Sequence, residues 1–148
     1  MPGTFHVIVG VDGSTGGQRA LRWALREAAH RHGTVQAVCA WRQDGPVGAN
    51  SVDHATALLD REIRAALADL PAPPPTAYEA VEGRAPRALT QASRDADLLV
   101  LGSHGHGRVR HTVLGSVSEE CIRKAACPVV VIPVPVERHE PAEPALRG

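Results

Sequence analysis

Short apolar segments alternate with amphipathic segments along most of this chain. Residues 5–11 are apolar and rich in β-branched side chains, which is typical of a buried strand. A helical pattern follows, because apolar residues recur at helical spacing from Ala20 to Ala28. The same alternation predicts further strands over residues 35–41, 76–81, 97–102 and 128–136, and further helices over 53–70, 86–95 and 116–126.

Strands that are separated by helices lie parallel, and their right-handed crossovers cover both faces of the sheet. We therefore predict an α/β fold: one doubly wound, five-stranded parallel sheet with helices on both faces, which makes it Rossmann-like. The length of 148 residues suits a single domain. We place this domain at residues 1–136 and expect the polar, proline-punctuated segment 137–148 to be a disordered tail.

Charge and composition argue against several classes of partner. Sixteen Lys and Arg residues balance sixteen Asp and Glu residues, which disfavours binding to nucleic acid or an anionic membrane. No apolar run approaches the roughly 20 residues that span a bilayer, and no signal-type segment opens the chain. Three widely spaced cysteines form neither a disulfide framework nor a C-x-x-C pair: Cys39, Cys121 and Cys127. We expect a cytoplasmic protein.

Two predicted strands end in glycines combined with polar groups. The first runs into Gly10-Val11-Asp12-Gly13-Ser14, and the fourth runs into Gly102-Ser103-His104-Gly105-His106-Gly107. In doubly wound sheets, ligands bind beyond the carboxyl ends of the strands, where the strand order reverses. If the first and fourth strands are neighbours, both segments face one crevice, and this crevice is the predicted ligand site.

The segment after the fourth strand favours an anion. Gly115 and Ser116 open a predicted helix, whose first backbone N–H groups and dipole suit a phosphate group. Ser116 and Ser118 add hydroxyl groups. The structural alternative is a capping box, in which Ser116 pairs with Glu119 and has no role in binding.

Three histidines in the same loop raise the possibility of a metal site. His104, His106 and His111 follow the pattern His-x-His-x4-His, but no carboxylate or thiolate lies at a matching interval. We therefore assign no metal site. An alternative function is a nucleotidyl- or adenylyl-transferring enzyme that uses His104 or His106, although the usual downstream partners of such a histidine motif are missing.

These residues resemble the universal stress protein family over nearly the whole chain, from Phe5 to about Val136. The motif G-x2-G-x9-G-[S/T] is complete as Gly102, Gly105, Gly115 and Ser116. The segments 9–14 and 127–132 resemble the family as well. Family members with the complete motif bind ATP, so the resemblance implies the ATP-binding subgroup and the strand order 3-2-1-4-5.

The resemblance also implies site residues. Val11 and Asp12 would flank the adenosine, and Ala40 would touch the adenine. The ribose and phosphates, with Mg²⁺ bridging the phosphates, would lie against the fourth strand's loop and the following helix: Gly102, His104, Gly105, Gly115, Ser116, Val117 and Ser118. Arg108 and Arg110 lie in the gap of the motif and are interpreted as solvated charges.

The function implied is that of an ATP-binding regulatory module in a stress response, acting on a protein partner that the sequence does not identify. We assign no catalytic residue, because the chain has no Walker lysine and no arranged base; slow ATP hydrolysis or autophosphorylation at Ser116 or Ser118 is the most we expect. The apolar last strand, residues 128–136, predicts a homodimer if it forms a sheet edge. A structural dimer module with no nucleotide is a further alternative.

Overall fold

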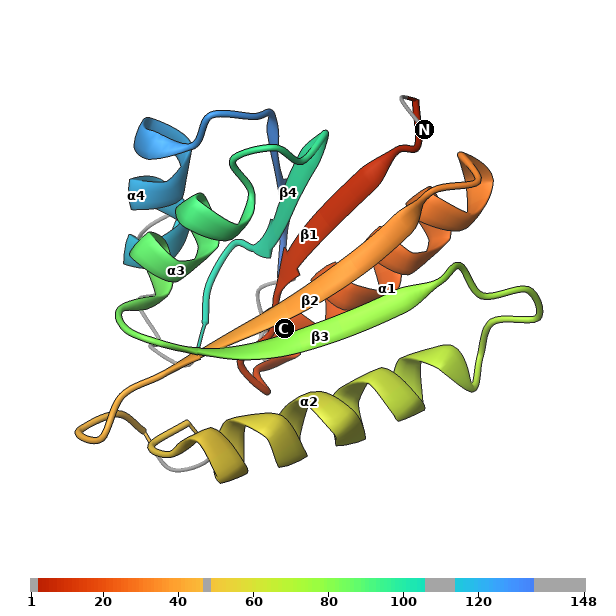
Figure 1. Ribbon diagram of the computed structural model, residues 1–148. Helices are drawn as coiled ribbons and strands as arrows, with labels where there is room; N and C mark the ends of the chain where they lie inside the picture. The colour runs from red at the N-terminus through yellow and green to blue at the C-terminus, as the bar shows by residue number, and fades with distance from the viewer. Residues whose placement is uncertain (1–2, 47–48, 106–113, 135–148) are drawn as a thin grey trace, which may run out of the picture.

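A computed structural model describes residues 3–46, 49–105 and 114–134. Its sheet has five parallel strands in the order β3-β2-β1-β4-β5 (Figure 1). This confirms the predicted fold class and strand order. The elements follow one another as β1 (His6–Gly10), α1 (Thr15–His30), β2 (Thr34–Trp41), α2 (Val52–Leu67), β3 (Thr76–Glu82), α3 (Ala85–Ala92), β4 (Leu98–Gly102), α4 (Ser116–Lys124) and β5 (Val129–Ile132).

Two helices cover each face of the sheet, as Figure 1 shows. Helices α1 and α2 pack on one face, where the apolar stripe from Ala20 to Ala28 meets the buried side chains of Val7 and Val9. Helices α3 and α4 pack on the other face, around Ile8 and Leu99. This alternation of Val7, Ile8 and Val9 between two cores is why the strand is continuously apolar in sequence.

The parallel register brings the carboxyl ends of the three central strands to one edge of the sheet. Val9 of β1 pairs with Ala37 of β2 on one side and with Val100 of β4 on the other. The loops that follow these strands therefore begin at the same level. The strand order reverses beside β1, so these loops border the place where doubly wound sheets bind ligands.

Some boundaries differ from the predicted ones. Strand β5 covers Val129–Ile132 rather than 128–136, because Pro133 has no N–H to donate to a sheet ladder. The N-cap of α4 is Gly115 rather than Ser116, and no described side chain caps this helix, so the alternative of a capping box between Ser116 and Glu119 is not formed. The proposed tail, residues 137–148, lies outside the described residues. No helix in the described ranges is long and apolar enough to cross a membrane.

Candidate functional site

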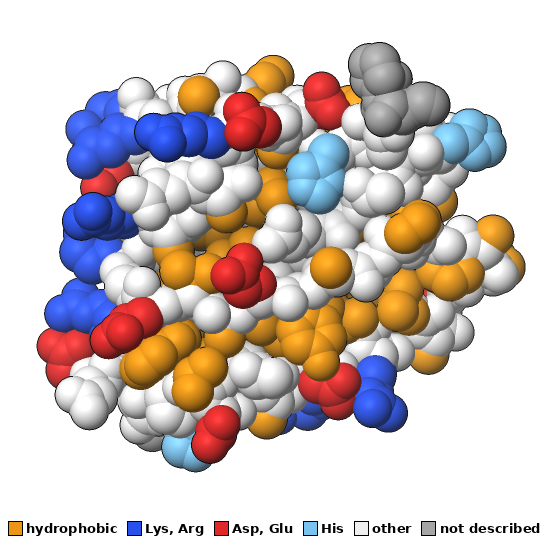
Figure 2. Space-filling view, in the orientation of Figure 1, with side chains coloured by type: hydrophobic (Ala, Val, Ile, Leu, Met, Phe, Trp, Pro, Cys, Tyr) orange, Lys and Arg blue, Asp and Glu red, His pale blue; other side chains and the backbone are white. Residues whose placement is uncertain are grey.

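A cavity of about 410 Å³ opens at the carboxyl ends of the central strands. Figure 2 shows hydrophobic side chains in a hollow on this face, with Lys and Arg side chains gathered along the edge where α3 and α4 lie. The structure brings every predicted site residue to the wall of this one cavity: Val11, Asp12, Ala40, Gly102, His104, Gly105, Gly115, Ser116, Val117 and Ser118.

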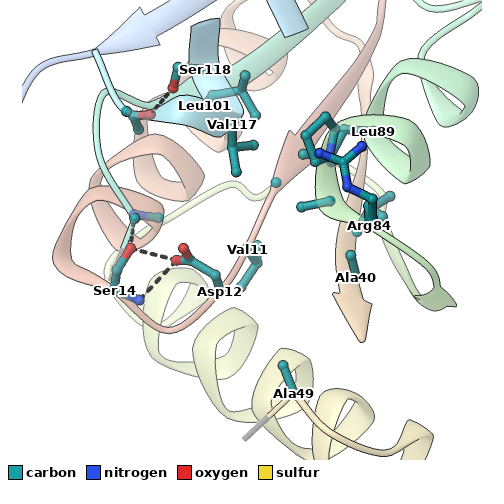
Figure 3. Close-up of a pocket in the computed structure, with 18 of the residues that line it drawn as sticks. Val11, Asp12, Ser14, Ala40, Ala49, Arg84, Leu89, Leu101, Val117 and Ser118 are labelled. Carbon is teal, nitrogen blue, oxygen red and sulfur yellow. Dashed lines mark hydrogen bonds between the residues drawn. The ribbon is translucent and has the colours of Figure 1, made fainter. Parts of the chain in front are cut away.

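The residues that follow β4 and open α4 line one part of the cavity, which we call the backbone end because three of the five are glycines: Gly102, His104, Gly105, Gly115 and Ser116. Another part of the wall is apolar, and we call it the apolar end: Ala40, Ala49, Ala85, Pro86 and Leu89. Figure 3 shows the Asp12 turn on one side of the cavity and Ala40, Arg84 and Leu89 on the other. The cavity therefore offers a flat apolar group a different environment from a polar one.

The turn after β1 fixes the Asp12 carboxylate at the cavity wall. Its Oδ1 accepts hydrogen bonds from the backbone N–H of Ser14, at 3.0 Å, and from the Ser14 hydroxyl (Figure 3). The Ser14 hydroxyl in turn accepts the N–H of Gly17 at 3.0 Å and thereby caps α1. Asp12 is thus held by the first turn of α1, which orients its second carboxylate oxygen independently of any ligand.

Gly102 ends β4 where the chain passes very close to α1. A Cβ on Gly102 would lie 2.5 Å from the carbonyl carbon of Gly16. Only a residue without a side chain fits in such a contact. The β4–α4 segment can therefore lie against the first turn of α1, which brings His104 and Gly105 beside Asp12. A Cβ on Gly105 would lie 2.7 Å from the Asp12 carboxylate.

Ser103 joins this segment to the neighbouring strand. Its side chain is buried, and its Oγ accepts the backbone N–H of Val134 at 3.1 Å. Its carbonyl oxygen accepts the N–H of Gly115 at 2.6 Å, which fixes the residue that caps α4. The same Oγ lies 3.2 Å from the Nδ1 atom of His104.

The first turn of α4 lines the cavity beside the backbone end. The first N–H groups of an α-helix have no partner within the helix. The two serines of this turn differ: Ser116 is exposed, whereas Ser118 is buried and donates its hydroxyl proton to the Gly102 carbonyl oxygen at 2.7 Å (Figure 3). Ser118 therefore fastens α4 to β4, and its hydroxyl proton is already used.

Sequence reasoning missed most of the apolar end and two cationic side chains. Leu89 lies in the predicted helix 86–95 and packs in the core, and it also lines the cavity. Arg42 and Arg84 line the cavity from the loops that follow β2 and β3. The position of these loops, directly after two strands of a parallel sheet, is the signal that would have included them.

Part of the predicted loop lies outside the described residues. It contains His106, Arg108, Arg110 and His111, so the three-histidine pattern has only His104 inside them. Within the described ranges, no group of three His, Cys, Asp or Glu side chains is arranged to hold a metal ion.

The cysteines are protected thiols. Burial, assisted by the nearby negative charge of Asp12, raises the pKa of the Cys39 thiol to about 11. Burial, assisted by Glu120, raises the pKa of Cys121 to about 11. The pKa of Cys127 is also raised, chiefly by burial. Such thiols carry little thiolate at neutral pH and are poor nucleophiles.

Comparisons with known proteins agree with this architecture. Residues 4–133 match the model of the universal stress protein family. Universal stress protein Rv2623 of Mycobacterium tuberculosis is 38% identical over an alignment of 138 positions, which covers 85% of this chain and 46% of that protein. Universal stress protein Mb2019 of Mycobacterium bovis is 31% identical over 150 residues, with 94% of this chain and 46% of that protein covered. The chain thus spans about half the length of these curated relatives.

Solved structures share the fold. A universal stress protein in complex with cAMP is 26% identical, with a TM-score of 0.67 over 86% of this chain and 95% of that one. A universal stress protein from Archaeoglobus fulgidus in complex with dAMP is 22% identical, with a TM-score of 0.66 over 88% and 98% of the two chains. With the family model matching almost all of the described chain, this protein belongs to the universal stress protein family.

Proposed function

We propose that this chain binds ATP in the described cavity and acts as a nucleotide-dependent regulatory module in a stress response. The observation that carries the proposal is the pairing of a backbone end and an apolar end within one cavity. A nucleotide has the same division, since its base is flat and largely apolar and its phosphates are anionic. The relative with bound cAMP, at 26% identity, supports an adenine nucleotide as the ligand class.

The phosphates lie at the backbone end in this proposal. The N-terminus of α4 has no side-chain cap among the described residues, and its first N–H groups have no partner within the helix. These groups and the positive end of the helix dipole favour an anion. Gly115 and Ser116 stand at this terminus, and Gly105 and His104 form the facing wall. Such backbone donors bind phosphate without a net positive charge on the protein, whose formal charge is zero.

The adenine lies at the apolar end, and the ribose lies between the two ends. Ala40 is the penultimate residue of β2, and its small side chain leaves room for a ring; Leu89 lines the same space. Asp12 lies between the ends, with a carboxylate already oriented by Ser14. It is placed to accept hydrogen bonds from ribose hydroxyl groups, while Val11 and Val117 contact the nucleoside.

Mg²⁺ fits this site as a companion of the phosphates. Magnesium in nucleotide sites is held mainly by phosphate oxygens and water, with one or two carboxylates. Asp12 is the carboxylate that lines the described part of the cavity. We therefore propose that Mg²⁺ bridges phosphate oxygens and that Asp12 is the protein group placed to approach it.

The described residues favour binding over catalysis. Among the described residues of the cavity wall there is no lysine of the kind that contacts phosphates in many ATP-hydrolysing enzymes. A nucleotidyl-transferring enzyme would use His104 as its described candidate, and steady-state turnover of ATP with a co-substrate would reveal it. A binding module shows at most slow hydrolysis or autophosphorylation.

Dimerisation is part of the proposal. Strand β5 is an edge of the sheet, and all four of its residues are Val or Ile that are only half-buried in the single chain. An apolar edge of this kind is stabilised by pairing with a second copy. We propose a cytoplasmic homodimer that pairs through the segment 128–136, and sedimentation of the purified protein would detect it.

The test of nucleotide binding is the substitution Ser116→Pro. Gly115 is extended, with φ −78° and ψ 170°, which is the conformation preferred before a proline. Proline is tolerated at the first position of a helix, so the change removes one N–H and one hydroxyl while α4 is preserved. Because hydrogen bonds to charged groups contribute roughly 1.5–3 kcal/mol, ATP affinity should fall by about tenfold or more.

Ser116→Ala is the matched control for this variant. It removes only the hydroxyl, and ATP affinity should change by less than about threefold if the backbone carries the contact. Titration calorimetry with ATP, ADP, AMP and cAMP measures both variants and ranks the nucleotides. Failure of the wild-type protein to bind any of them would refute the proposal and leave the structural dimer module as the better account. Equal ATP affinities of the wild-type protein and Ser116→Pro would show that the phosphates do not bind at the N-terminus of α4.

A further inference from the structure

Arg84 connects α3 and α4, the two helices on one face of the sheet that line the cavity. It is the residue before α3 and makes no capping hydrogen bond with its side chain. Its Nη2 instead donates to Oε1 of Glu120 on α4 at 3.2 Å. Figure 3 shows the Arg84 side chain next to Leu89 on the α3 side of the cavity, with Val117 of α4 across from it.

The loop that carries Arg84 is held in place by its own backbone. Gly83 has a φ of +135°, a conformation that residues with a side chain rarely adopt. The Gly83 N–H donates to the Trp41 carbonyl oxygen at 2.9 Å, which ties the end of β3 to the end of β2. Arg84 therefore leaves the sheet from a fixed point at the apolar end.

Glu120 is a firm anchor for the Arg84 guanidinium. Its side chain is 18% exposed, against 57% for Arg84, and its Oε2 also accepts a hydrogen bond from Lys124 at 3.0 Å. Hydrogen bonds from Lys124 and Arg84 lower the pKa of Glu120, which favours its charged form. The guanidinium is thus held at one edge while much of its surface remains accessible.

We propose that the Arg84 guanidinium stacks on the nucleobase and that Glu120 positions it for this contact. The inference rests on the proposed nucleotide function and adds the group that recognises the base. A guanidinium is planar and weakly hydrated, and it stacks on aromatic faces. The residues that follow Arg84 at the cavity wall are apolar: Ala85, Pro86 and Leu89. In this proposal, a base that lies against this apolar wall stacks on the flat face of the Arg84 guanidinium.

The alternative role for Arg84 is neutralisation of phosphate. The N-terminus of α4 and Gly105 belong to the backbone end, whereas Arg84 extends from the apolar end. Its Nη2 also donates to Glu120. The other arginine of the described cavity wall, Arg42, pairs with Asp44 in its own loop at 3.0 Å. The position of Arg84 at the apolar end and its hydrogen bond to Glu120 favour contact with the base over contact with the phosphates.

The experiment compares Arg84→Ala with the wild-type protein for ATP, ADP and AMP. Stacking on the base predicts the same loss, about fivefold, for all three nucleotides, because they share the base. Neutralisation of phosphate predicts a loss that shrinks from ATP to AMP. Arg84→Lys keeps the charge without the plane, so it should lose nearly as much as Arg84→Ala.

Arg87→Ala is the matched control. Arg87 lies one turn further along the chain and lines the neighbouring surface hollow with Arg84, but it does not line the candidate cavity. Its removal should leave all three affinities within about twofold of wild type, since it makes no contact with the base. Thermal unfolding of each variant checks that the fold is retained.

The role of Glu120 is tested in two backgrounds. Glu120→Gln should weaken ATP about twofold in the wild-type protein and have no further effect in Arg84→Ala, because it acts through Arg84. An equal effect in both backgrounds would overturn the positioning role. Unchanged affinity of Arg84→Ala, or a loss confined to ATP, would overturn the stacking contact while the nucleotide proposal stands. Absence of nucleotide binding by the wild type would overturn both.

Discussion

The two ends of the cavity are formed by different parts of the chain. The backbone end consists of glycines, a loop and a helix N-terminus, whereas the apolar end consists of side chains that three separate elements supply. At the backbone end, geometry depends on where chain segments can approach one another. At the apolar end, it depends on how large the side chains are. A side chain added where two chain segments touch at the backbone end should therefore act on folding, whereas a larger side chain at the apolar end should act on ligand fit.

The comparison also separates two glycines that belong to the same motif. A Cβ on Gly102 would lie 2.5 Å from the backbone of Gly16, whereas the nearest contact of a Cβ on Gly115 would be 3.2 Å from the Ser103 carbonyl oxygen. Gly102 is thus required for packing between β4 and α1. Gly115 has ordinary φ and ψ angles and lies at the ligand side of the same segment.

The largest effect should come from Gly102→Ala. The added methyl group meets backbone atoms that no side-chain rotation can move, so the β4–α4 segment must shift away from α1. We expect a loss of about 3 kcal/mol in the free energy of unfolding, as for overpacked cores. Urea denaturation measures it directly.

Gly115→Ala is the control for this glycine. Its loss should stay below about 1 kcal/mol, because the surroundings need to yield by only a few tenths of an ångström. If Gly102→Ala and Gly115→Ala were equally stable, the two motif glycines would have the same structural role, which would contradict this prediction.

The sequence predicts the backbone end of the cavity better than the apolar end. Alternating strand and helix patterns with turn signals lead directly to the sheet, and the resemblance supplies its order. The glycine spacing predicts the backbone end, since it records where the chain makes a close approach. The apolar end is different: Leu89 reads as an ordinary core residue, Ala49 lies between a predicted strand and a predicted helix, and Arg84 reads as a surface charge. Only the packing of α3 and of the β2–α2 loop brings them to one wall.

Ala40→Leu tests the apolar end. Ala40 lies at the end of β2 and lines the cavity, so a larger side chain there occupies space that the proposed base needs. We expect ATP affinity to fall by about tenfold, with little change in unfolding free energy because the cavity has room for the side chain. Calorimetry and urea denaturation measure the two quantities. Ala40→Gly, which enlarges the same space, should retain binding; equal affinities of the leucine variant and wild type would place the base elsewhere.

The smallest effect concerns two buried thiols, one near each end. Cys39 precedes Ala40 in β2, and Cys121 lies in α4; both have a pKa raised from 9.0 to about 11. Above pH 9 the unfolded chain releases these protons while the folded chain keeps them. The stabilisation is therefore complete below pH 9 and is lost as the pH rises toward 11. At pH 9.5 each thiol should lower the free energy of unfolding by about 0.8 kcal/mol relative to neutral pH.

Urea denaturation at pH 7.5 and 9.5 of Cys39→Ala and Cys121→Ala separates the two contributions. Each variant should lose its own share of the alkaline destabilisation and keep the other, since the thiols lie in different cores. Asp12→Asn extends the test to the cavity. It removes the negative charge that assists burial at Cys39 but not at Cys121, so it should reduce the alkaline effect only while Cys39 is present. The same reduction in Cys39→Ala would mean that Asp12 acts through a group other than this thiol.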